Sequence, residues 1–381
     1  MNLTKYKLGD LIVQRREKNN NYDVPIRGVS KEGFIPAKQK DADTSIYNVF
    51  YKYDFVFNPA RMELNSIALN LEYDKALCSS LYEVFYVKDE SIVLPEFLNL
   101  HIKRDEFARH CDYIGLGSAR EYCRFANIAE FDIELPPIEV QEEIVEADRL
   151  IKKRIRLNNQ MIQHLEATAQ ALYRKTFVDN IDKENLPEGW RMGTLGDLCV
   201  ISSSKRIFES EYCHRGVPFY RGKEITQKKN GEQISDLIFI SQTRYNELVR
   251  DYGKPKCGDI LLTAVGTIGN SYMVQEEEFY FKDGNIVWLH NFIATGASSY
   301  IYEFFQSQSF EKLISEIAIG STQKALTIQS LTQLEMPIPN KKSLQTFGNS
   351  IQIIYNDIKI KRQENDKLTE LQSLLLAKMG Q

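Results

Sequence analysis

Basic, amide and hydroxyl side chains recur in short glycine- or serine-containing stretches that the sequence predicts to be loops. Lysine and arginine neutralise phosphates, and arginine, glutamine and asparagine donate to base edges in the major groove, so these residue types suit a nucleic acid. In the second half of the chain the candidate DNA-binding residues are Ser203, Lys205, Arg206, Arg221, Lys223, Thr267, Thr322, Gln323 and Lys324. In the first half they are Arg27, Ser30, Asn58, Arg61, Asn65, Ser118 and Arg120. Each alone reads equally well as a solvated loop residue, so the binding hypothesis depends on their recurrence at matching places in both halves.

No catalytic motif accompanies these loops. Residues 115–117 and 266–269 lack the three-glycine spacing of a dinucleotide fingerprint, and the sequence contains no phosphate loop, nucleophile elbow or H-E-x-x-H pair. Asn58-Pro59 lacks the second proline and the aromatic residue of an adenine methyltransferase motif. The cysteines show no zinc spacing, and the adjacent Cys213 and His214 are too few for a metal site. We therefore expect no catalytic residue, metal or cofactor in this chain.

The elements that must position the loops are repeated along the chain. The sequence 8–11 returns at 195–198, 52–57 is echoed at 257–262, 117–119 at 320–322, and the proline cluster 133–137 at 334–339. Gln141 and Gln345 follow the two proline clusters, each before a long helical segment. An offset of roughly 200 residues is too long for a solenoid. It predicts two copies of one domain, at 1–137 and 185–340, followed by long helices at 138–184 and 341–381.

Both long segments carry an apolar stripe with heptad-like spacing. The first stripe contains Ile144, Ala147, Ile151, Met161, Leu165 and Leu172, together with Arg154, Asn158 and Thr168. The second contains Phe347, Ile351, Ile354, Ile358, Leu368, Leu371 and Leu375, and is interrupted by Lys361 and Asn365. A helix of about 55 Å is longer than one domain can cover. We therefore expect an antiparallel coiled coil between the two helices, the alternative being that each packs only on its own domain.

Each globular part mixes strands and helices, which predicts an α+β fold. Strands are expected at 47–57, 81–87, 259–263 and 285–289, and amphipathic helices at 96–111 and 299–317. The net charge of −4 is unusual for a free-standing nucleic-acid binder, so positive charge must be local or supplied by partners. The start of the chain has no apolar run, no membrane helix is expected, and scattered cysteines suggest reduced thiols in the cytoplasm.

On these residues the chain resembles the specificity subunits of type I restriction–modification systems. The resemblance covers essentially all 381 residues, and its most specific parts are 135–141, 186–190 with 195–198, 258–262 and 320–324. It implies two target recognition domains with pseudo-two-fold symmetry, each reading one half of a bipartite double-stranded DNA sequence, and two helices that set the spacing. It also implies that the helices dock two modification subunits, which bind S-adenosylmethionine and methylate adenine at N6. Restriction subunits that use ATP and Mg²⁺ would complete the assembly, and no membrane would be involved.

The first copy departs from the pattern of the second. It has residues 61–64 in place of the Gly-x-Ile-Gly element, and Arg120-Glu121 in place of Gln323-Lys324. We interpret this as a different sequence preference. An enzyme, such as a modification–specificity fusion or a nuclease, would need a cofactor loop for which the repeat leaves no room. A scaffold or decoy without active methyltransferase partners would explain the helices but not the recurrent loops, and salt-dependent DNA binding separates these readings.

Overall fold

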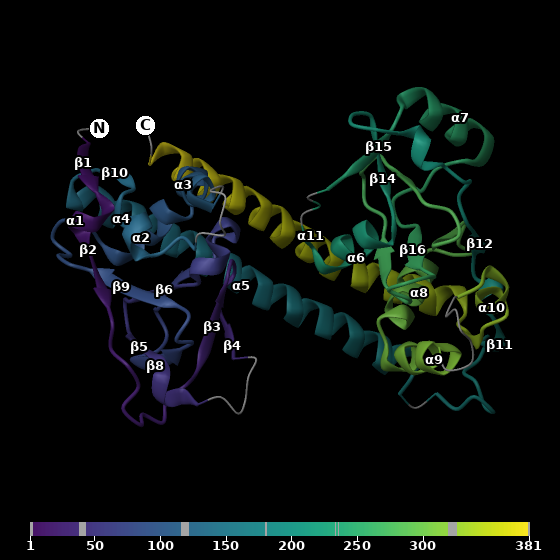
Figure 1. Cartoon of the computed structure of the whole chain (residues 1–381). Helices are drawn as coiled ribbons and strands as arrows, with labels where there is room; N and C mark the ends of the chain where they lie inside the picture. The colour runs from purple at the N-terminus through teal and green to yellow at the C-terminus, as the bar shows by residue number, and fades with distance from the viewer. Residues whose placement is uncertain are drawn as a thin grey trace. The chain divides into compact units, whose positions relative to one another are not determined.

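The computed structural model describes residues 3–37, 43–115, 122–179, 181–232, 234, 236–318 and 326–379. The chain forms two compact units (Figure 1). The first unit comprises Met1–Leu157 and Asn365–Gln381, and the second comprises Asn158–Glu364. Each unit therefore contains one globular part and a section of both long helices.

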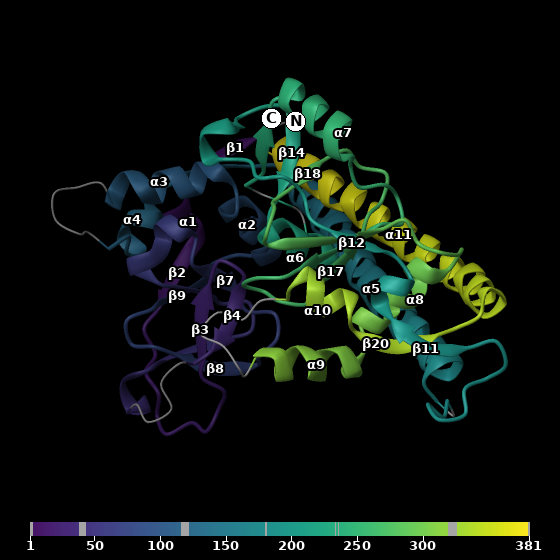
Figure 2. The same cartoon turned by 90° about the vertical axis from the view of Figure 1, so that its right-hand side faces the viewer.

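Both globular parts are built on the same four-stranded antiparallel sheet. The strand order is β2-β9-β6-β7 in the first unit and β12-β19-β16-β17 in the second; Figure 2 labels strands of both. The strands are β2 (Ile12–Arg15), β6 (Phe55–Phe57), β7 (Ile67–Leu69), β9 (Glu83–Val87), β12 (Val200–Ser202), β16 (Ile260–Thr263), β17 (Ser271–Met273) and β19 (Ile286–His290). Every residue of β6 and β16 is buried, as their apolar composition requires. The predicted repeat is thus confirmed at the level of the sheet.

The same helices and a two-stranded ribbon surround each sheet. In the first unit these are β1 (Thr4–Lys7), α1 (Leu8–Leu11), α2 (Pro95–Ile102), α3 (Asp105–Gly115), α4 (Phe125–Ala129) and β10 (Asp132–Leu135). In the second they are β11 (Arg191–Thr194), η3 (Leu195–Asp197), α8 (Ala297–Phe305), α9 (Gln308–Ala318), α10 (Ile328–Thr332) and β20 (Glu335–Ile338). A Cβ on Gly9 would lie 3.0 Å from Ala129 Cβ, and one on Gly196 would lie 2.6 Å from Thr332 Cγ2. This close approach to α4 or α10 explains the glycine in the repeated sequence 8–11 and 195–198.

The segments inserted between the strands differ. The first unit inserts β3 (Arg27–Ser30), β4 (Gly33–Pro36), η1 (Thr44–Ile46), β5 (Asn48–Tyr51), η2 (Pro59–Leu64) and β8 (Lys75–Cys78). The second inserts η4 (Glu209–Glu211), β13 (Tyr212–Cys213), β14 (Val217–Tyr220), α6 (Gly222–Asn230), β15 (Ile238–Ile240), α7 (Gln242–Tyr252) and β18 (Tyr280–Phe281). The first set forms the strand pairs β3-β4 and β5-β8, and the second forms a sheet ordered β13-β15-β14-β18.

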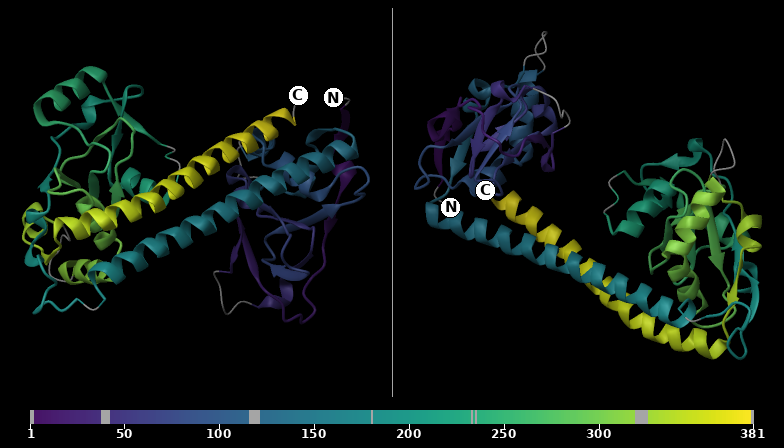
Figure 3. Two further views of the ribbon diagram at one scale, coloured as in Figure 1. Left: turned by 180° about the vertical axis from the view of Figure 1, so that it is seen from behind. Right: turned by 90° about the horizontal axis from the view of Figure 1, so that it is seen from below.

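The long helices α5 (Ile138–Phe177) and α11 (Lys341–Lys378) pair in antiparallel fashion within each unit (Figure 3). In the second unit the rings of Phe177 and Phe347 lie 4.8 Å apart, and Glu166 binds Arg362 at 3.0 Å. In the first unit Gln372 Nε2 donates to Asp148 Oδ1 at 2.6 Å. The predicted α+β class and antiparallel helix pair are confirmed.

The predicted stripe was wrong on one flank of each helix. Arg154, Met161 and Thr168 are exposed, and the buried or half-buried positions are Asp148, Ile151, Ile155, Asn158, Ile162, Leu165 and Ala169. Leu371 is also exposed, with Gln372 half-buried beside it. The error arose because two positions of the true seam, Asp148 and Gln372, are polar and bond each other.

Three other expectations need correction. The predicted strand 47–57 is two strands in different sheets, β5 and β6, because Tyr53 turns the chain with a φ of 67°. Each predicted amphipathic helix is two helices, α2 with α3 and α8 with α9. The two glutamines are not equivalent: Gln141 is buried and bonds Leu94 N, Ile92 O and Pro136 O, whereas Gln345 is exposed. The fourth residue of α11, matching Gln141 in α5, is the buried Leu344.

Candidate nucleic-acid interface

In the second unit the candidate interface includes the loop 264–270 between β16 and β17. Gly269 N donates to Thr263 O at 2.9 Å, and Asn270 N donates to Thr263 Oγ1 at 3.0 Å, so the loop closes on itself. Gly266 has a φ of +78°, in the left-handed region that favours glycine, and a Cβ there would meet nothing within 4 Å. Val265 and Thr267 beside it are exposed. The loop therefore presents a short, stiff tip with a hydroxyl group.

Helix α6 supports this loop from its inner side. Thr226 Oγ1 lies 3.1 Å from Thr267 Oγ1 and accepts from Asn270 Nδ2 at 3.0 Å. Lys229 Nζ donates to Asn270 Oδ1 at 3.1 Å. Burial lowers the pKa of Lys229. The polar side chains of the loop, the Thr267 hydroxyl among them, thus have partners on α6, while Thr267 remains exposed at the tip.

The C-terminal end of α6, which also carries Lys229, is tied to the long helices. The Arg362 guanidinium of α11 donates to Lys229 O at 3.5 Å and also binds Glu166 of α5. Gly231 ends α6 with a φ of +69° and lies against Arg362, as expected for a left-handed helix cap. Loop, helix α6 and helix pair therefore form one connected polar structure inside the second unit.

Arg221 is the most constrained of the predicted contact residues. Its Nε and Nη2 atoms donate to the fully buried carboxylate of Glu224 at 3.1 and 2.7 Å. Burial opposes ionisation of Glu224, but the hydrogen bonds from Arg221 outweigh it and hold the pKa of this carboxyl below its ordinary value. Arg221 thus fixes the start of α6 and has fewer free donors than an unpaired arginine.

The remaining predicted residues of the second unit occupy two surface regions. Lys223 binds Asp236 at 3.2 Å, and Arg206 binds Asp283 at 3.2 Å, both in exposed ion pairs. Such pairs are weak, so both cations can exchange their carboxylates for phosphates. Ser203 Oγ donates to Ile286 O at 2.9 Å, which is a contact within the fold. The ammonium group of Lys205 lies over the Tyr252 ring at 4.8 Å.

In the first unit the matching loop lies between β6 and β7 and contains η2. Asn58 Oδ1 accepts from Ala60 N at 3.1 Å and so caps the start of η2. Arg61 is exposed at its centre. Asn65 ends it with a φ of 52°, and its buried side-chain oxygen has no hydrogen-bond partner in the part of the chain that the structure describes. These three predicted residues are therefore brought together on one short loop.

Arg27 and Ser30 lie on the separate hairpin β3-β4. Arg27 Nε donates to Tyr73 Oη at 2.8 Å, and its guanidinium lies over the Tyr73 ring. Ser30 Oγ donates to Gly33 O at 3.3 Å and accepts from Glu32 N at 3.2 Å, so it shapes the hairpin turn. The hairpin packs beside β7, at the far end of the η2 loop.

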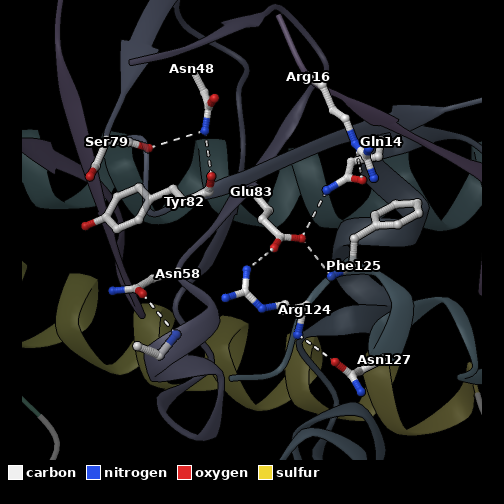
Figure 4. A network of polar contacts seen from close by, with 11 residues as sticks. Gln14, Arg16, Asn48, Asn58, Ser79, Tyr82, Glu83, Arg124, Phe125 and Asn127 are labelled. Atoms are coloured by element: carbon white, nitrogen blue, oxygen red, sulfur yellow. Dashed lines mark hydrogen bonds and ion pairs between the residues drawn. The ribbon is translucent and has the colours of Figure 1, made fainter. Parts of the chain in front are cut away.

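A network around Glu83 was not predicted from the sequence (Figure 4). The Glu83 carboxylate accepts from Phe125 N at 2.7 Å, from Gln14 Nε2 at 3.2 Å and from Arg124 Nη1 at 3.3 Å. Arg16 Nε in turn donates to Gln14 Oε1 at 2.8 Å. Neither arginine stands beside glycine or serine, the signal used to find the other candidates. The only sequence sign was that Arg124 follows the predicted loop 117–120 closely.

The five predicted residues Ser118, Arg120, Thr322, Gln323 and Lys324 lie outside the described residues. The residues that follow these segments are in equivalent places in the two units. Cys123 N donates to Pro59 O at 3.1 Å in the first unit, and Leu326 N donates to Ala264 O at 3.0 Å in the second. In both units, therefore, the chain returns beside the loop that follows the fully buried strand, β6 or β16, which we call the central strand.

Within the described ranges, no three histidine, cysteine, aspartate or glutamate residues come close enough to hold a metal ion. All six cysteines are free thiols, four of them buried. Among the same residues, no helix is both long and apolar enough to span a membrane.

The family model for the type I restriction modification DNA specificity domain matches residues 3–167 and 187–370. The chain belongs to this family. It contains two copies of the specificity domain, and each match begins near the first strand of one unit and ends within a long helix.

Named relatives of this specificity-domain protein include three restriction enzyme specificity subunits. A Haemophilus influenzae protein with the provisional name of a type I specificity subunit is 29% identical over 237 residues, 59% of this chain and 56% of the relative. The MjaVIII specificity subunit of Methanocaldococcus jannaschii is 23% identical over 64% of this chain and 60% of its own length. The HindI specificity subunit of H. influenzae is 20% identical over 76% and 77%. The match thus spans less than two thirds of the first two relatives.

The crystal structure of a type I restriction–modification S subunit from M. genitalium has a similar fold. The TM-score is 0.59 at 14% sequence identity, over 99% of this chain and 96% of the other. At this identity the likeness concerns the fold alone.

Proposed function

We propose that this chain is the DNA-recognition subunit of a type I restriction–modification assembly and carries no chemistry of its own. Each globular part reads one half of a bipartite DNA sequence, through the loop after its central strand and the neighbouring inserted segments. The observation that carries this proposal is one sheet frame used twice with different insertions. A repeated frame supplies the same geometry at two places, while different insertions supply different side chains to read different bases.

The two long helices set the distance between the half-sites and dock two modification subunits. Apolar side chains recur seven residues apart on exposed helix positions: Leu150 and Leu157 of α5 in the first unit, and Ile353 and Ile360 of α11 in the second. Ile353 is 66% exposed, which costs solvation free energy unless a partner covers it. A row with heptad spacing outside the seam is suited to a second helical partner.

S-adenosylmethionine would be bound by the modification subunits, and ATP and Mg²⁺ by the restriction subunits. Partners would also relieve the charge problem, since the chain is negative overall and several loop cations are paired with carboxylates. Partner subunits that close around the DNA can supply the missing positive charge. The modification subunits would have to flip the target adenine out of the duplex.

The test is co-expression with the candidate modification subunit, followed by sequencing of the host DNA for N6-methyladenine. The expected result is a single motif with two short specific parts and a gap of fixed length. A soluble complex that yields no motif would point to a decoy, and two proteins that form no complex would favour a scaffold.

A further inference from the structure

Two exposed arginines of the first unit are held in fixed orientations by one carboxylate. Glu83, at the start of β9, is half-buried and accepts three hydrogen bonds, one of them from the backbone N–H of Phe125. Arg124 binds the carboxylate directly, and Arg16 is held through the Gln14 side chain. Figure 4 shows Gln14 of β2 and Arg124 at the start of α4 reaching the Glu83 carboxylate, and Arg16 reaching the Gln14 side chain.

Among the residues that the structure describes, both guanidinium groups keep most of their donors free. A guanidinium carries five N–H donors in a planar fork. The hydrogen bonds of the Arg124 side chain use Nη1, and those of Arg16 use Nε. The Arg124 side chain is 64% exposed, and its guanidinium lies 5.7 Å from the ring of the exposed Tyr122. A fork with free donors, fixed from behind, matches the two acceptors on the major-groove edge of guanine.

Arg124 lies in a segment that runs beside the η2 loop. Cys123 N donates to Pro59 O at 3.1 Å, so the segment 122–125 runs alongside the η2 loop that carries Arg61. Arg124 therefore belongs to the same edge of the sheet as the loop residues predicted from the sequence.

The paired carboxylate favours base reading over phosphate binding. Glu83 offsets part of the charge of Arg124, which weakens its attraction to any phosphate along the backbone. Unlike the acid of a simple surface pair, Glu83 is also held in place by hydrogen bonds from Phe125 N and Gln14 Nε2. The direction of the free N–H groups is unaffected, and direction is what a base edge requires. A supporting carboxylate also lowers the entropy cost of binding, because the side chain is already ordered.

We propose that Arg124 is a specificity-determining residue of the first unit, that Arg16 assists it, and that Glu83 positions both against a guanine-containing half-site. This inference rests on the proposed function. It gives the two units different reading chemistry, because the described part of the second unit has no carboxylate at the place of Glu83. In the first unit, Glu83 pairs with the third residue of β6, Phe57. In the second unit, the third residue of β16, Leu262, pairs instead with the buried Val287.

The experiment uses the complex with modification subunits and measures its affinity for duplexes. One duplex carries the motif that the methylation sequencing identifies. In each of two others, a different half of this motif is scrambled. For Arg124→Ala we expect discrimination against one scrambled half to fall roughly 5- to 150-fold, the range for loss of one bidentate arginine–guanine contact. Discrimination against the other half should not change. Glu83→Gln should reduce discrimination against the same scrambled half by a smaller factor.

Two further variants keep the test decisive. Arg124→Lys retains the charge but not the fork, so it should fail to restore discrimination. Lys88→Ala removes an exposed cation at the opposite end of β9 and should have no effect. Equal loss of affinity for all duplexes, rescued by Arg124→Lys, would show a phosphate contact and overturn the inference, as would no change. If wild type discriminated against neither scrambled half, the proposed function itself would fail.

Discussion

The first and second units share the order of four strands but satisfy the same buried group in different ways. Asp54 and Asp259 each precede the central strand, and each accepts a hydrogen bond from a backbone N–H three residues earlier, on Tyr51 or Lys256. Asp54 is completed by an ion pair with Arg15, its nearest atoms 2.6 Å apart. Asp259 is completed by Trp288 Nε1 at 2.9 Å. Both units thus have an acid that closes this turn, but its partner comes from a different strand of the sheet in each, Arg15 of β2 or Trp288 of β19.

A second difference stands on the helices that cover the sheets. The seventh residue of α2 is His101 and the seventh of α8 is Glu303, and both are buried. His101 lies 3.1 Å from the Arg104 guanidinium. Glu303 accepts from Tyr355 Oη of α11 and Gln170 Nε2 of α5, both at 2.6 Å. Of these two side chains, only that of Glu303 links its helix, α8, to both long helices.

The largest expected effect concerns the partner rows. If each unit presents one row, Ile353→Asp with Ile360→Asp should reduce the bound modification subunits from two to one, because a buried unpaired carboxylate is strongly disfavoured. Leu150→Asp with Leu157→Asp should remove the other copy. Native mass spectrometry of the complex measures the stoichiometry. Gln363→Asp, an exposed change on α11, is the control, and two copies retained in both double variants would contradict the assignment of the rows.

The buried acids should differ in their contribution to stability. Asp54→Ala leaves Arg15 without its partner and should cost about 3–5 kcal/mol. Asp259→Ala removes hydrogen bonds to neutral donors and should cost about 1–3 kcal/mol. Both tryptophans, Trp190 and Trp288, lie in the second unit, so their fluorescence reports urea unfolding of that unit and circular dichroism reports both.

Asp132→Ala is the matched control for these variants, because its ion pair with Lys7 is exposed and should contribute little to stability. Equal losses of stability for Asp54→Ala and Asp259→Ala would contradict the prediction that the ion pair with Arg15 contributes more than the hydrogen bond with Trp288.

Two buried groups, His101 in the first unit and Glu303 in the second, should make opposite contributions to the pH dependence of stability. Burial lowers the pKa of His101 to about 4, so its neutral form stabilises the first unit fully above pH 6.5, and this contribution is lost as the pH falls towards 4. The loss should reach about 3 kcal/mol. Burial raises the pKa of Glu303, so its contribution is fully present below about pH 4.5 and is lost as the pH rises through the raised value.

Thermal unfolding between pH 4 and pH 8 measures this difference. His101→Gln should flatten the acid limb of the first unit, and Glu303→Gln should flatten the dependence that tryptophan fluorescence records for the second. Parallel pH profiles for the two units, unchanged by either variant, would be incompatible with these environments.

The smallest effect concerns the turn before the central strand. Tyr53 and Gly258 occupy this turn with φ values of 67° and 88°. Gly258→Ala should cost about 1 kcal/mol, because a left-handed conformation strains any residue with a Cβ. Tyr53→Gly should change stability by under about 1 kcal/mol, since relief of strain is offset by the greater freedom of glycine in the unfolded chain. Melting temperatures of the two variants test this, and a large loss in Tyr53→Gly would mean that the ring itself is needed.

Much of the frame could be predicted because it repeats. The glycine shared by 8–11 and 195–198 is needed for a close contact, and the acids Asp54 and Asp259 close a turn before the central strand. Both features are therefore present in both copies and can be recognised in the sequence. The seam was misread because Asp148 and Gln372 look like surface residues, although they face each other. The echo of Gln141 was accidental, since its buried side chain bonds three backbone groups and the exposed Gln345 has no such role.

The candidate site was less predictable than the frame. A glycine-containing stretch led to Thr267, and the match between the two halves led to Arg61, both on exposed loops. The same reasoning also selected Arg221 and Ser203, whose side chains bond within the fold. Arg16, Glu83 and Arg124 are far apart in sequence and become neighbours only through pairing of β2 with β9 and the return of the chain beside β6. No local pattern reveals such a network.

The most direct test of the account is the methylated motif produced by three versions of the complex in the same host. Wild type should give one bipartite motif. Arg124→Ala should alter only one half of it and Thr267→Ala only the other, with the gap unchanged. Changes in the same half, or in both halves for either variant, would contradict the claim that each unit reads its own half of the site.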